Sequence, residues 1–532
     1  MNQSPNLPVL IVGAGPVGLT LACDLARRGV RTRLVDKLRT PTTESRAIIV
    51  HARSLEMLER IGVVEEVVAT GLKVTAAVMH SGQKKLVHID LNGVDSPYPY
   101  SVVLPQTDTE RILSERLRAL GGVVERGVEL VKFDQDDATV TAHLRIADGN
   151  DEVAKASWIV GTDGSRSTVR EQTGQRLEGS FKGERFVLAD VEADHDLDRR
   201  AIHTFFPASG SGPLLAFPMV GTRMRLIAEV HLDTPADVAP TMQQVQAITD
   251  ERAGGIALRS THWITVFDIH HAQVLRYRVG RALLAGDAAH VHSPAGGQGM
   301  NTGMQDVFNL GWKLGAVASG ADPALLDSYH IERHPIAERV IKDTTRLTNL
   351  ATVSSPAERA VRNFLVRVAT GFPAVRKAVV DETEETDLAY RDSPILDGTS
   401  ARHGGPSAGE AAPDVAGLGE GVALHTLLAA NLDHTVVHVA GAGAIPEPAP
   451  ASARGPKGTR RLLFCDAPVD TTGYDRIVVD PDRRVASRYG LGEEPGIIVV
   501  RPDGYIGLIT AEETAVERYF SRITTPQGWR GL

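Results

Sequence analysis

The hydrophobic pattern of the first 36 residues predicts a strand, a helix and a second strand. The continuous apolar run Val9 to Val12 is typical of a buried parallel strand. A glycine-rich turn, Gly13 to Gly18, follows it and leads into a helical pattern that runs to Arg28, where Gly29 ends the helix. A second apolar strand ends on Asp36. This order of elements is that of a dinucleotide-binding unit.

Each glycine of the turn has a physical purpose in such a unit. Gly13 allows the tight turn, Gly15 lets the backbone approach a pyrophosphate, and Gly18 permits close packing of the helix on the strand. The helix N-terminus offers free N–H groups to phosphates, and Asp36 is placed to hold a ribose hydroxyl. Because 51 of the 532 residues are glycine, the motif alone is weak, and an unrelated βαβ turn is the alternative. The pattern does not distinguish FAD from NAD.

Further along the chain, the pattern predicts two β-rich regions and one helical region. Alternation from Val74 to Leu91 and from Phe186 to Phe267 predicts antiparallel strands, with a short helix over Met242 to Glu251. Asp322 to Val380 has helical periodicity. The acidic run that follows it, Asp381 to Asp387, is expected to be a solvated linker.

A shorter helix is predicted near the N-terminus. Ser54 is expected to open this amphipathic helix, which runs to Ile61 and stops at Gly62.

The last quarter of the chain has a different composition. Leu396 to Ala453 is rich in Gly, Ala and Pro and is expected to be a boundary or linker. Beyond it the pattern predicts strands over Arg461 to Cys465, Gly496 to Arg501 and Tyr505 to Ile509, with a Pro-Asp-Gly hairpin turn at Pro502 to Gly504.

Length and charge restrict the class of protein. A chain of 532 residues is too long for one core and favours two or three domains. Its net charge of −9 argues against a nucleic-acid partner, and no apolar run has membrane-spanning length. The two cysteines, Cys23 and Cys465, have no CxxC or zinc spacing. These features predict a cytoplasmic protein without a membrane partner.

Two further turns follow predicted strands and carry polar residues. The first is Gly161-Thr-Asp163-Gly164, after the apolar strand that ends at Val160. The second is Gly286-Asp287, which leads through a glycine-rich stretch into a long helix that ends near Ala318. Both turns point backbone donors at a ligand in the functional interpretation; in the alternative, the two aspartates only cap turns and the glycines form a flexible loop.

Three motifs therefore stand in order: GAGPVG at 13–18, GTDGSRSTVR at 161–170 and AGDAAHVHSPAGGQGMNTGMQDVFNLGWKL at 285–314. Together they resemble the group A FAD-dependent aromatic monooxygenases, in the branch of phenol, pentachlorophenol and aromatic polyketide hydroxylases. The resemblance covers residues 5 to 395. It implies an α/β fold with a Rossmann-like FAD-binding domain of the glutathione-reductase type (1–75, 101–180 and 276–395), a β-rich substrate domain (76–100 and 181–275) and a thioredoxin-like C-terminal domain (396–532). In the last of these, Glu494 to Val500 resembles the strand after that fold's cis-proline.

The resemblance also assigns residues to the cofactor. Asp36 stands where the family more often has Glu. Pro294 is the one residue assigned to catalysis, and its carbonyl is expected near the flavin carbon at which oxygen reacts. The helix from Gly299 would direct its positive end at the reduced flavin. The cofactor-binding residues are Gly13, Gly15, Pro16, Val17, Gly18, Asp36, Lys37, Arg46, Gln106, Asp163, Gly286, Asp287, Pro294, Gly297, Gly299, Met300 and Asn301.

The implied activity is hydroxylation of a phenolic or polycyclic aromatic substrate. Because the chain has no second GxGxxG, NADPH or NADH would act as a transient co-substrate that reduces FAD, and O2 would then give a flavin C4a-hydroperoxide. Phe205, Phe217 and Arg223 are the candidate substrate residues, with core packing as the alternative. The spacing of His290 and His292 suggests a metal, but beside a flavin motif no metal is predicted.

Two alternatives stay open on the same scaffold: Baeyer–Villiger oxygen insertion, and a flavin-containing protein that binds an aromatic ligand without turnover. The substrate, the position oxidised, the catalytic base and the choice between NADPH and NADH are not determined by the sequence. A homodimer is one assembly that the resemblance allows.

Overall fold

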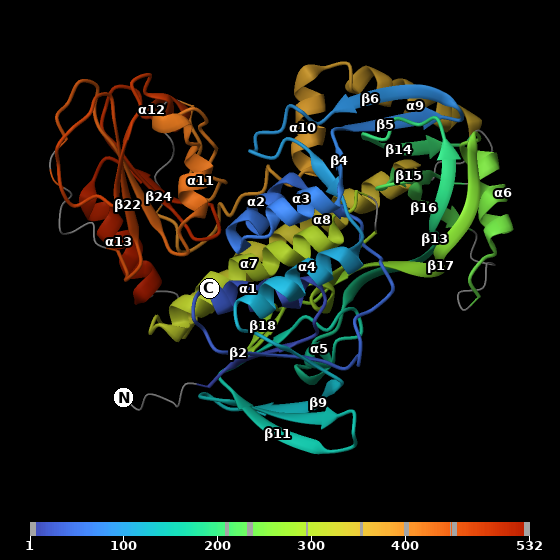
Figure 1. The fold of residues 1–532 in the computed structure, drawn as a ribbon, viewed down its shortest axis with the longest axis horizontal. Helices are drawn as coiled ribbons and strands as arrows, with labels where there is room; N and C mark the ends of the chain where they lie inside the picture. Colours follow the sequence, from blue (N-terminus) through green and yellow to red (C-terminus); the bar gives the residue numbers. More distant parts are fainter. Residues whose placement is uncertain are drawn as a thin grey trace.

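The computed structural model describes residues 7–207, 212–230, 238–293, 296–351, 355–397, 404–446, 448 and 455–525. The fold is of the mixed α/β class, and Figure 1 shows its three parts: a central sheet with helices, a β-rich part at one side, and a C-terminal part at the other. No helix in these ranges is both long enough and apolar enough to span a bilayer.

The central sheet has the strand order β18-β19-β12-β1-β2-β8. Strand β1 pairs in parallel with both β2 and β12, so that Val12 lies beside Val35 and Gly161. This register brings the ends of the three strands, and with them two of the three motifs, to one edge of the sheet. The bounds of the strands are β1 Val9–Val12, β2 Thr32–Asp36, β8 Val124–Arg126, β12 Trp158–Gly161, β18 Arg278–Val279 and β19 Ala282–Leu284.

Helices α1 (Pro16–Arg27) and α7 (Gly299–Ala318) pack against each other beside this sheet. Small residues allow the close approach: a Cβ on Gly311 of α7 would lie 2.2 Å from the carboxylate of Asp24 on α1. The strand–helix–strand unit predicted for the start of the chain is confirmed as β1, α1 and β2. The neighbouring helices are α2 Ala52–Ile61, α3 Val64–Thr70, α4 Gln106–Ala119 and α5 Thr168–Gln172.

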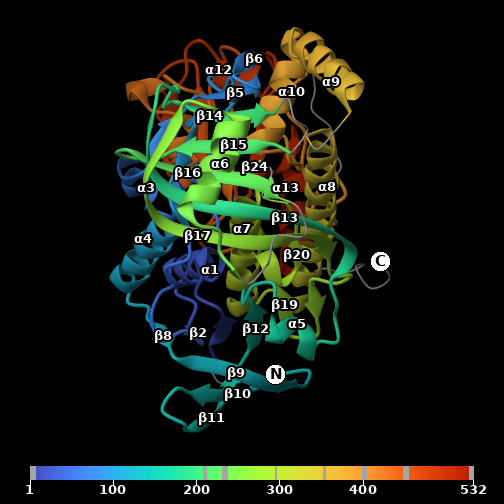
Figure 2. The same ribbon diagram turned by 90° about the vertical axis from the view of Figure 1, so that its right-hand side faces the viewer.

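An eight-stranded sheet forms the β-rich part, with the order β20-β17-β13-β16-β15-β14-β5-β6 (Figure 2). The antiparallel pair β5 and β6 confirms the prediction for Val74 to Leu91. Helix α6 (Met242–Arg252) is also confirmed, and a capping box of Thr241 and Gln244 starts it. The strands are β5 Ala76–Ser81, β6 Lys84–Asp90, β13 Glu178–His195, β14 Ala201–Phe206, β15 Leu214–Pro218, β16 Arg223–Val230, β17 Ile256–Gln273 and β20 His290–Val291.

Two three-stranded sheets and three helices complete the first 395 residues. One small sheet joins β3 Ile49–Val50, β7 Ser101–Val103 and β4 Leu72–Val74; the other joins β11 Asp151–Ala156, β10 Val140–Ile146 and β9 Val128–Gln135. The helical region predicted for Asp322 to Val380 consists of α8 Asp327–Ala351, α9 Pro356–Ala369 and α10 Pro373–Thr383.

The C-terminal part contains a five-stranded sheet with the order β23-β22-β21-β24-β25. Its central strand β21 (Thr435–Val439) lies inside the segment that was expected to be a linker, so that expectation is wrong for this stretch. All five residues of β21 are buried, and the flanking Gly, Ala and Pro concealed so short a strand in the composition. The hairpin turn at Pro502 to Gly504 is confirmed. The other elements are α11 Leu424–Ala429, β22 Arg460–Cys465, β23 Arg476–Val479, α12 Arg484–Arg488, β24 Gly496–Val500, β25 Ile506–Thr510 and α13 Glu513–Thr524.

The strand expected within Glu494 to Val500 is observed as β24. Among the described residues no peptide bond is cis.

Candidate functional site

Two adjoining cavities open at the edge of the central sheet where β1, β2 and β12 end. The larger has a volume of about 500 Å³ and the smaller about 270 Å³. They share lining residues from the glycine turn, the loop between β2 and β3, α4 and the turn after β12, so they form one elongated site. The shared residues are Gly15, Thr42, Gln106, Thr162 and Gly164.

The glycine turn forms the floor where the two cavities meet. Gly13 has a φ of +103°, and a Cβ there would lie 2.4 Å from the carbonyl oxygen of Thr162. A Cβ on Gly18 would lie 2.0 Å from the carbonyl oxygen of Gly13, so only glycine permits this contact of helix with turn. A Cβ on Gly15 would meet nothing within 4 Å, because Gly15 faces the open cavity. The turn thus leaves space for a ligand directly in front of α1.

The N-terminus of α1 is open toward this space. Its N-cap, Gly15, provides no side-chain hydrogen bond, and Pro16 and Val17 line the larger cavity. Asp36 lies in the smaller cavity beside Lys37, and its Oδ2 accepts a hydrogen bond from the backbone N–H of Ala14 at 2.7 Å. Free helical N–H groups and an acidic residue beside them are the donor and acceptor set that suits a pyrophosphate with its ribose.

Asp163 lines the smaller cavity and also caps a helix. Its Oδ1 accepts from the hydroxyl of Ser167 at 2.5 Å and its Oδ2 from the backbone N–H of Thr168 at 2.7 Å, at the start of α5. The turn-capping interpretation left open by the sequence therefore describes its contacts within the protein. Gln106 bridges the two cavities; its Oε1 accepts from the backbone N–H of Ala47 at 3.2 Å.

The larger cavity is bounded on one side by the start of α7 and the Gly286-Asp287 turn. Gly297, Gly299 and Met300 line it, and the N-cap of α7 supplies no side-chain hydrogen bond, so the first amides of the helix are open to the cavity. Asp287 lines the cavity and is exposed there. Desolvation by the surrounding protein raises the pKa of its carboxyl, and the charges of His290 and Arg46 oppose this effect. Arg46 lines the cavity as well.

Three of the predicted cofactor residues support the site from behind and do not line it. Gly18 packs as described above. A Cβ added to Gly286 would lie 3.0 Å from the side chain of Val17. Asn301 is buried, and its side-chain amide donates to the carbonyls of Ile49 and Gly297 at 3.0 and 2.9 Å. Pro294, the predicted catalytic residue, lies outside the described residues.

The other side of the larger cavity is an apolar wall from the eight-stranded sheet. Phe217 of β15, Ile227 of β16, and Phe267 and Ile269 of β17 form it, with His270 beside them. Phe217 is thus placed at the cavity as the sequence proposed. The sequence did not single out Glu44, Ile48, Ile227, Ile269 and Ser293, and it weighed His292 only as a metal ligand. The period-two spacing of Phe267 and Ile269 on one strand was the available signal for Ile269.

Phe205 and Arg223 do not line this cavity, so it gives no support to their prediction as substrate residues. Phe205 is buried on β14 and stacks on His80 with ring centroids 4.3 Å apart. Arg223 lies 3.6 Å from the carboxylate of Asp190. Phe205 packs in a different core cluster from Phe217, and residue type alone does not reveal which face of a strand meets the cavity.

His290 and His292 differ in their contacts. His290 donates from Nε2 to Asp306 at 2.7 Å, and both side chains are buried. His292 directs Nδ1 at the carbonyl of Ser293 at 3.0 Å, and burial is the largest cause that lowers its pKa to about 4. In the ranges that the structure describes, no group of three or more His, Cys, Asp or Glu could hold a metal ion.

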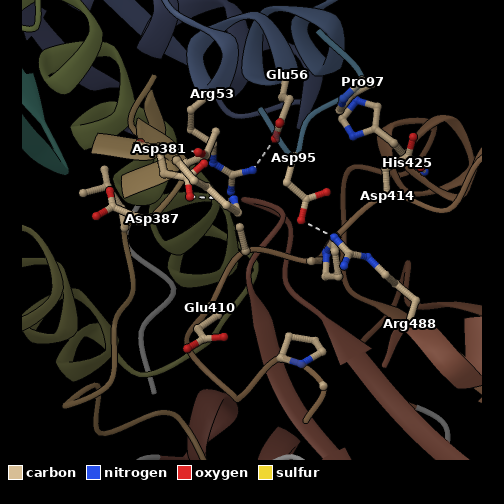
Figure 3. A pocket seen from close by; sticks show the side chains of 18 of the residues that line it. Arg53, Glu56, Asp95, Pro97, Asp381, Asp387, Glu410, Asp414, His425 and Arg488 are labelled. Carbon is tan, nitrogen blue, oxygen red and sulfur yellow. Dashed lines mark hydrogen bonds and ion pairs between the residues drawn. The ribbon is translucent and has the colours of Figure 1, made fainter. Parts of the chain in front are cut away.

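A separate cavity of about 410 Å³ lies between α2 and the C-terminal part (Figure 3). Its charged residues are engaged with one another or with neighbours: Arg53 with Glu56, Arg488 with Asp95, and Arg391 with Glu410. It contains none of the glycine motifs and lies apart from the site described above.

Comparison with known proteins identifies the class. Residues 6–344 match the FAD binding domain family. The chain is 40% identical over 399 residues to 6-methylpretetramide 4-monooxygenase from Streptomyces rimosus, covering 74% of this chain and 71% of that protein. It is 32% identical over 422 residues to pentachlorophenol 4-monooxygenase from Sphingobium chlorophenolicum, covering 77% and 76%. The structure of the OxyS anhydrotetracycline hydroxylase from Streptomyces rimosus matches with a TM-score of 0.78 and 29% identity, covering 97% of this chain and 99% of that one.

The chain belongs to the FAD binding domain family, and it is a flavoprotein monooxygenase. The resemblance to FAD-dependent aromatic monooxygenases that its three motifs indicated is thereby confirmed.

Proposed function

We propose that this protein hydroxylates a phenolic or polycyclic, polyketide-like aromatic substrate, with FAD as its cofactor and NADPH or NADH as a transient reductant. The observation that supports this most directly is the larger cavity, which joins the start of α7 and Asp287 on one side to the apolar wall of Phe217 and Phe267 on the other. One continuous space thus adjoins both a cofactor site and an apolar surface. The names of the relatives, which act on a pretetramide and on pentachlorophenol, agree with an aromatic substrate.

The residues fit FAD, because Gly15 faces an open cavity that a Cβ there would enter and the N-terminus of α1 is uncapped. We infer that α1 and Asp36 hold the pyrophosphate and adenosine half in the smaller cavity, and that Asp287 and the start of α7 hold the flavin half. When bound, FAD supplies the chemistry of hydride acceptance and oxygen activation. Open amides at the start of α7 stabilise negative charge placed there.

The apolar wall has two tasks in this proposal. Phe217 and Phe267 offer ring faces to an aromatic substrate, and such contacts prefer stacked or edge-to-face geometry. Ile227 and Ile269 are buried and fill the space around the rings, which excludes water from the reacting atoms.

We also propose that the division into FAD-binding, substrate and C-terminal domains follows the ranges expected from the sequence, with a Rossmann-like first domain and a thioredoxin-like last one.

The test measures NADPH and NADH oxidation by the FAD-loaded protein with a panel of phenols and aromatic polyketides. The expected result is ligand-stimulated oxidation with a mass gain of about one oxygen in the product. Phe217→Ala should raise KM or uncouple the reaction, because it removes a ring from the cavity. Phe205→Ala is the matched control, since it also removes a buried phenylalanine but leaves the cavity unchanged.

Other outcomes would contradict the proposal. Tight aromatic binding without any stimulated oxidation would indicate a ligand-binding flavoprotein. A product whose structure shows an oxygen inserted into a carbon–carbon bond would indicate Baeyer–Villiger chemistry.

A further inference from the structure

The loop that leads into α7 is held from behind by a buried histidine. Gly297 and Gly299 of this loop line the larger cavity. On the protein side, His51 Nε2–H donates to the carbonyl of Gly296 at 2.9 Å, and the backbone N–H of His51 donates to the side chain of Asn301 at 3.0 Å. Since Asn301 also donates to the carbonyl of Gly297, His51 fixes the loop at two points.

His51 is paired with Glu384, which lies 333 positions later in the chain. The distance from His51 Nδ1 to Glu384 Oε2 is 3.6 Å, and the two side chains are 1% and 0% exposed. The hydroxyl of Ser101 donates to Glu384 Oε1 at 2.6 Å, and its oxygen lies 3.0 Å from His51 Nδ1. Because Ser101 directs its single proton at Glu384, it accepts from His51 Nδ1. Both ring nitrogens of His51 then donate, which makes it an imidazolium.

The electrostatics of the pair agree with this assignment. Burial opposes charge on His51, but Glu384 and, more weakly, Glu385 raise the pKa of His51 above its ordinary value. Burial likewise opposes charge on Glu384, but His51 lowers the pKa of that carboxyl, helped by Ser101 and by the backbone N–H of Ala52. Each partner therefore keeps the other ionised in the interior.

Glu384 and Glu385 belong to the segment that was expected to be a solvated linker, and that expectation is wrong for both, since they are 0% and 1% exposed. Glu384 Oε2 accepts from the backbone N–H of Ala52 at 2.8 Å and so caps α2. Glu385 Oε1 accepts from the hydroxyl of Thr302 on the first turn of α7 at 3.1 Å. The backbone N–H at the start of α2 stabilises the buried carboxylate of Glu384.

We propose that His51, paired with Glu384, is a positioning residue of the FAD site: it holds the carbonyl of Gly296 and thereby fixes the loop from which α7 presents its N-terminus to the cavity. This inference rests on the proposed use of that loop by FAD. His51 acts through the backbone of the loop and does not line the cavity itself. Loss of the contact would leave the loop free to take other conformations, so the cofactor would have to order it on binding.

The test compares FAD affinity among His51 variants of the full-length apoprotein, measured by flavin fluorescence, with the reduction potential of bound FAD as a second reading. His51→Leu removes both donors, whereas His51→Gln keeps one N–H near the position of Nε2. His438→Gln is the matched control, because His438 is also buried and lies 3.7 Å from a carboxylate, that of Glu513 in the C-terminal part.

We expect His51→Leu to weaken FAD binding about tenfold or more, because it removes the hydrogen bond from a charged donor to the carbonyl of Gly296. His51→Gln should weaken binding less, because it keeps one N–H donor. The His438 control should bind FAD as the wild type does, and the reduction potential should shift only in the His51 series. If His51→Leu does not fold, Glu384→Gln removes the charge partner while keeping its shape, and it should also weaken binding.

Unchanged FAD affinity and potential in a folded His51→Leu or Glu384→Gln protein would overturn the inference. A wild-type protein that binds no FAD would instead overturn the proposed function, and this inference with it. The two failures are therefore distinguished by the wild-type measurement.

Discussion

Asp306 on α7 and Arg333 on α8 form an ion pair with 2.7 Å between Oδ1 and Nε, and neither side chain is accessible to solvent. The second carboxylate oxygen of Asp306 accepts from His290 at 2.7 Å and from the backbone N–H of Gly286 at 3.1 Å. This one carboxylate therefore joins two long helices to the turn that carries Asp287. It supports the wall of the larger cavity and does not line the cavity itself.

Asp306→Asn should destabilise the protein by about 3–5 kcal/mol, because it leaves the guanidinium of Arg333 buried without its charge partner. The measurement is the shift in thermal midpoint and in the urea midpoint. Asp327→Asn is the control, since Asp327 pairs with Arg278 at 2.9 Å but its side chain is 57% exposed, and such pairs contribute little. Equal shifts for the two variants would contradict the role assigned to burial.

Gly13→Ala and Gly15→Ala should separate folding from cofactor binding. A methyl group at Gly13 meets the backbone of Thr162 at a φ of +103°, so this variant should lose about 2 kcal/mol or more of stability. A methyl group at Gly15 meets no protein atom within 4 Å but enters the cavity, so this variant should keep its thermal midpoint and bind FAD more weakly. A stable Gly13→Ala protein with normal FAD affinity would show that the turn is not constrained as described.

Glu385 should make stability depend on pH. Burial is the main cause that raises its pKa from 4.5 to about 7, opposed by His51 and Arg333. Between these two values the folded protein holds a proton that the unfolded chain releases, so the free energy of unfolding falls as pH rises from 4.5 to about 7 and then levels off. The total loss is on the order of 3 kcal/mol.

Glu385→Gln should remove that dependence, which thermal midpoints measured from pH 5 to pH 8 would detect (roughly the window of the shift). Glu338→Gln is the control, because Glu338 is at the surface of α8 beside Lys342. The side-chain amide nitrogen of Gln305 donates to Glu385, while its amide oxygen is buried without a hydrogen-bond partner. Identical slopes in wild type and Glu385→Gln would contradict a titrating Glu385.

Removal of Arg501 should loosen the C-terminal part. Arg501 donates to Glu332 of α8 at 2.7 and 2.8 Å, and all the side chains involved are buried. After Arg501→Ala, Glu332 keeps only one of its two cationic partners described above, Lys313. The free energy of unfolding should therefore fall by about 3–5 kcal/mol. Limited proteolysis should then cleave the chain between the first 395 residues and the rest faster than in the wild type. Unchanged cleavage would indicate that apolar packing holds the C-terminal part in place.

The sequence predicted well what short-range patterns encode. The strand–turn–helix–strand unit, α6 and the β5–β6 pair depend on neighbours in the chain, and the turn glycines are needed wherever the backbone closes so tightly. The parallel register of β1 with β2 and β12 then brings the turns of Gly15 and Asp163 to one cavity, as the motif order implied.

The errors concern partners that are remote in sequence. Helix α2 begins at Ala52 and not at Ser54, because its cap is the carboxylate of Glu384, more than 300 residues away. Glu384 and Glu385 were interpreted as solvated for the same reason, since their hydrogen-bond partners Ala52, Ser101 and Thr302 lie elsewhere in the chain. Phe205 and Phe217 could not be separated, because the face that a strand presents to a cavity depends on what packs on the other side.

Helix α7 spans 20 residues, or about 30 Å at 1.5 Å per residue. Its first turn faces the larger cavity, whereas Trp312, near its other end, packs in a cluster with Val436 and Leu508 of the C-terminal sheet. The indole N–H of Trp312 donates to Asp503 at 3.1 Å. A chain ended at residue 395 would expose this indole and would remove Arg501 from the buried charges of Glu332 and Lys313. Buried contacts therefore cross the compositional border at residue 396, and the last quarter of the chain stabilises the helix whose first turn lines the larger cavity.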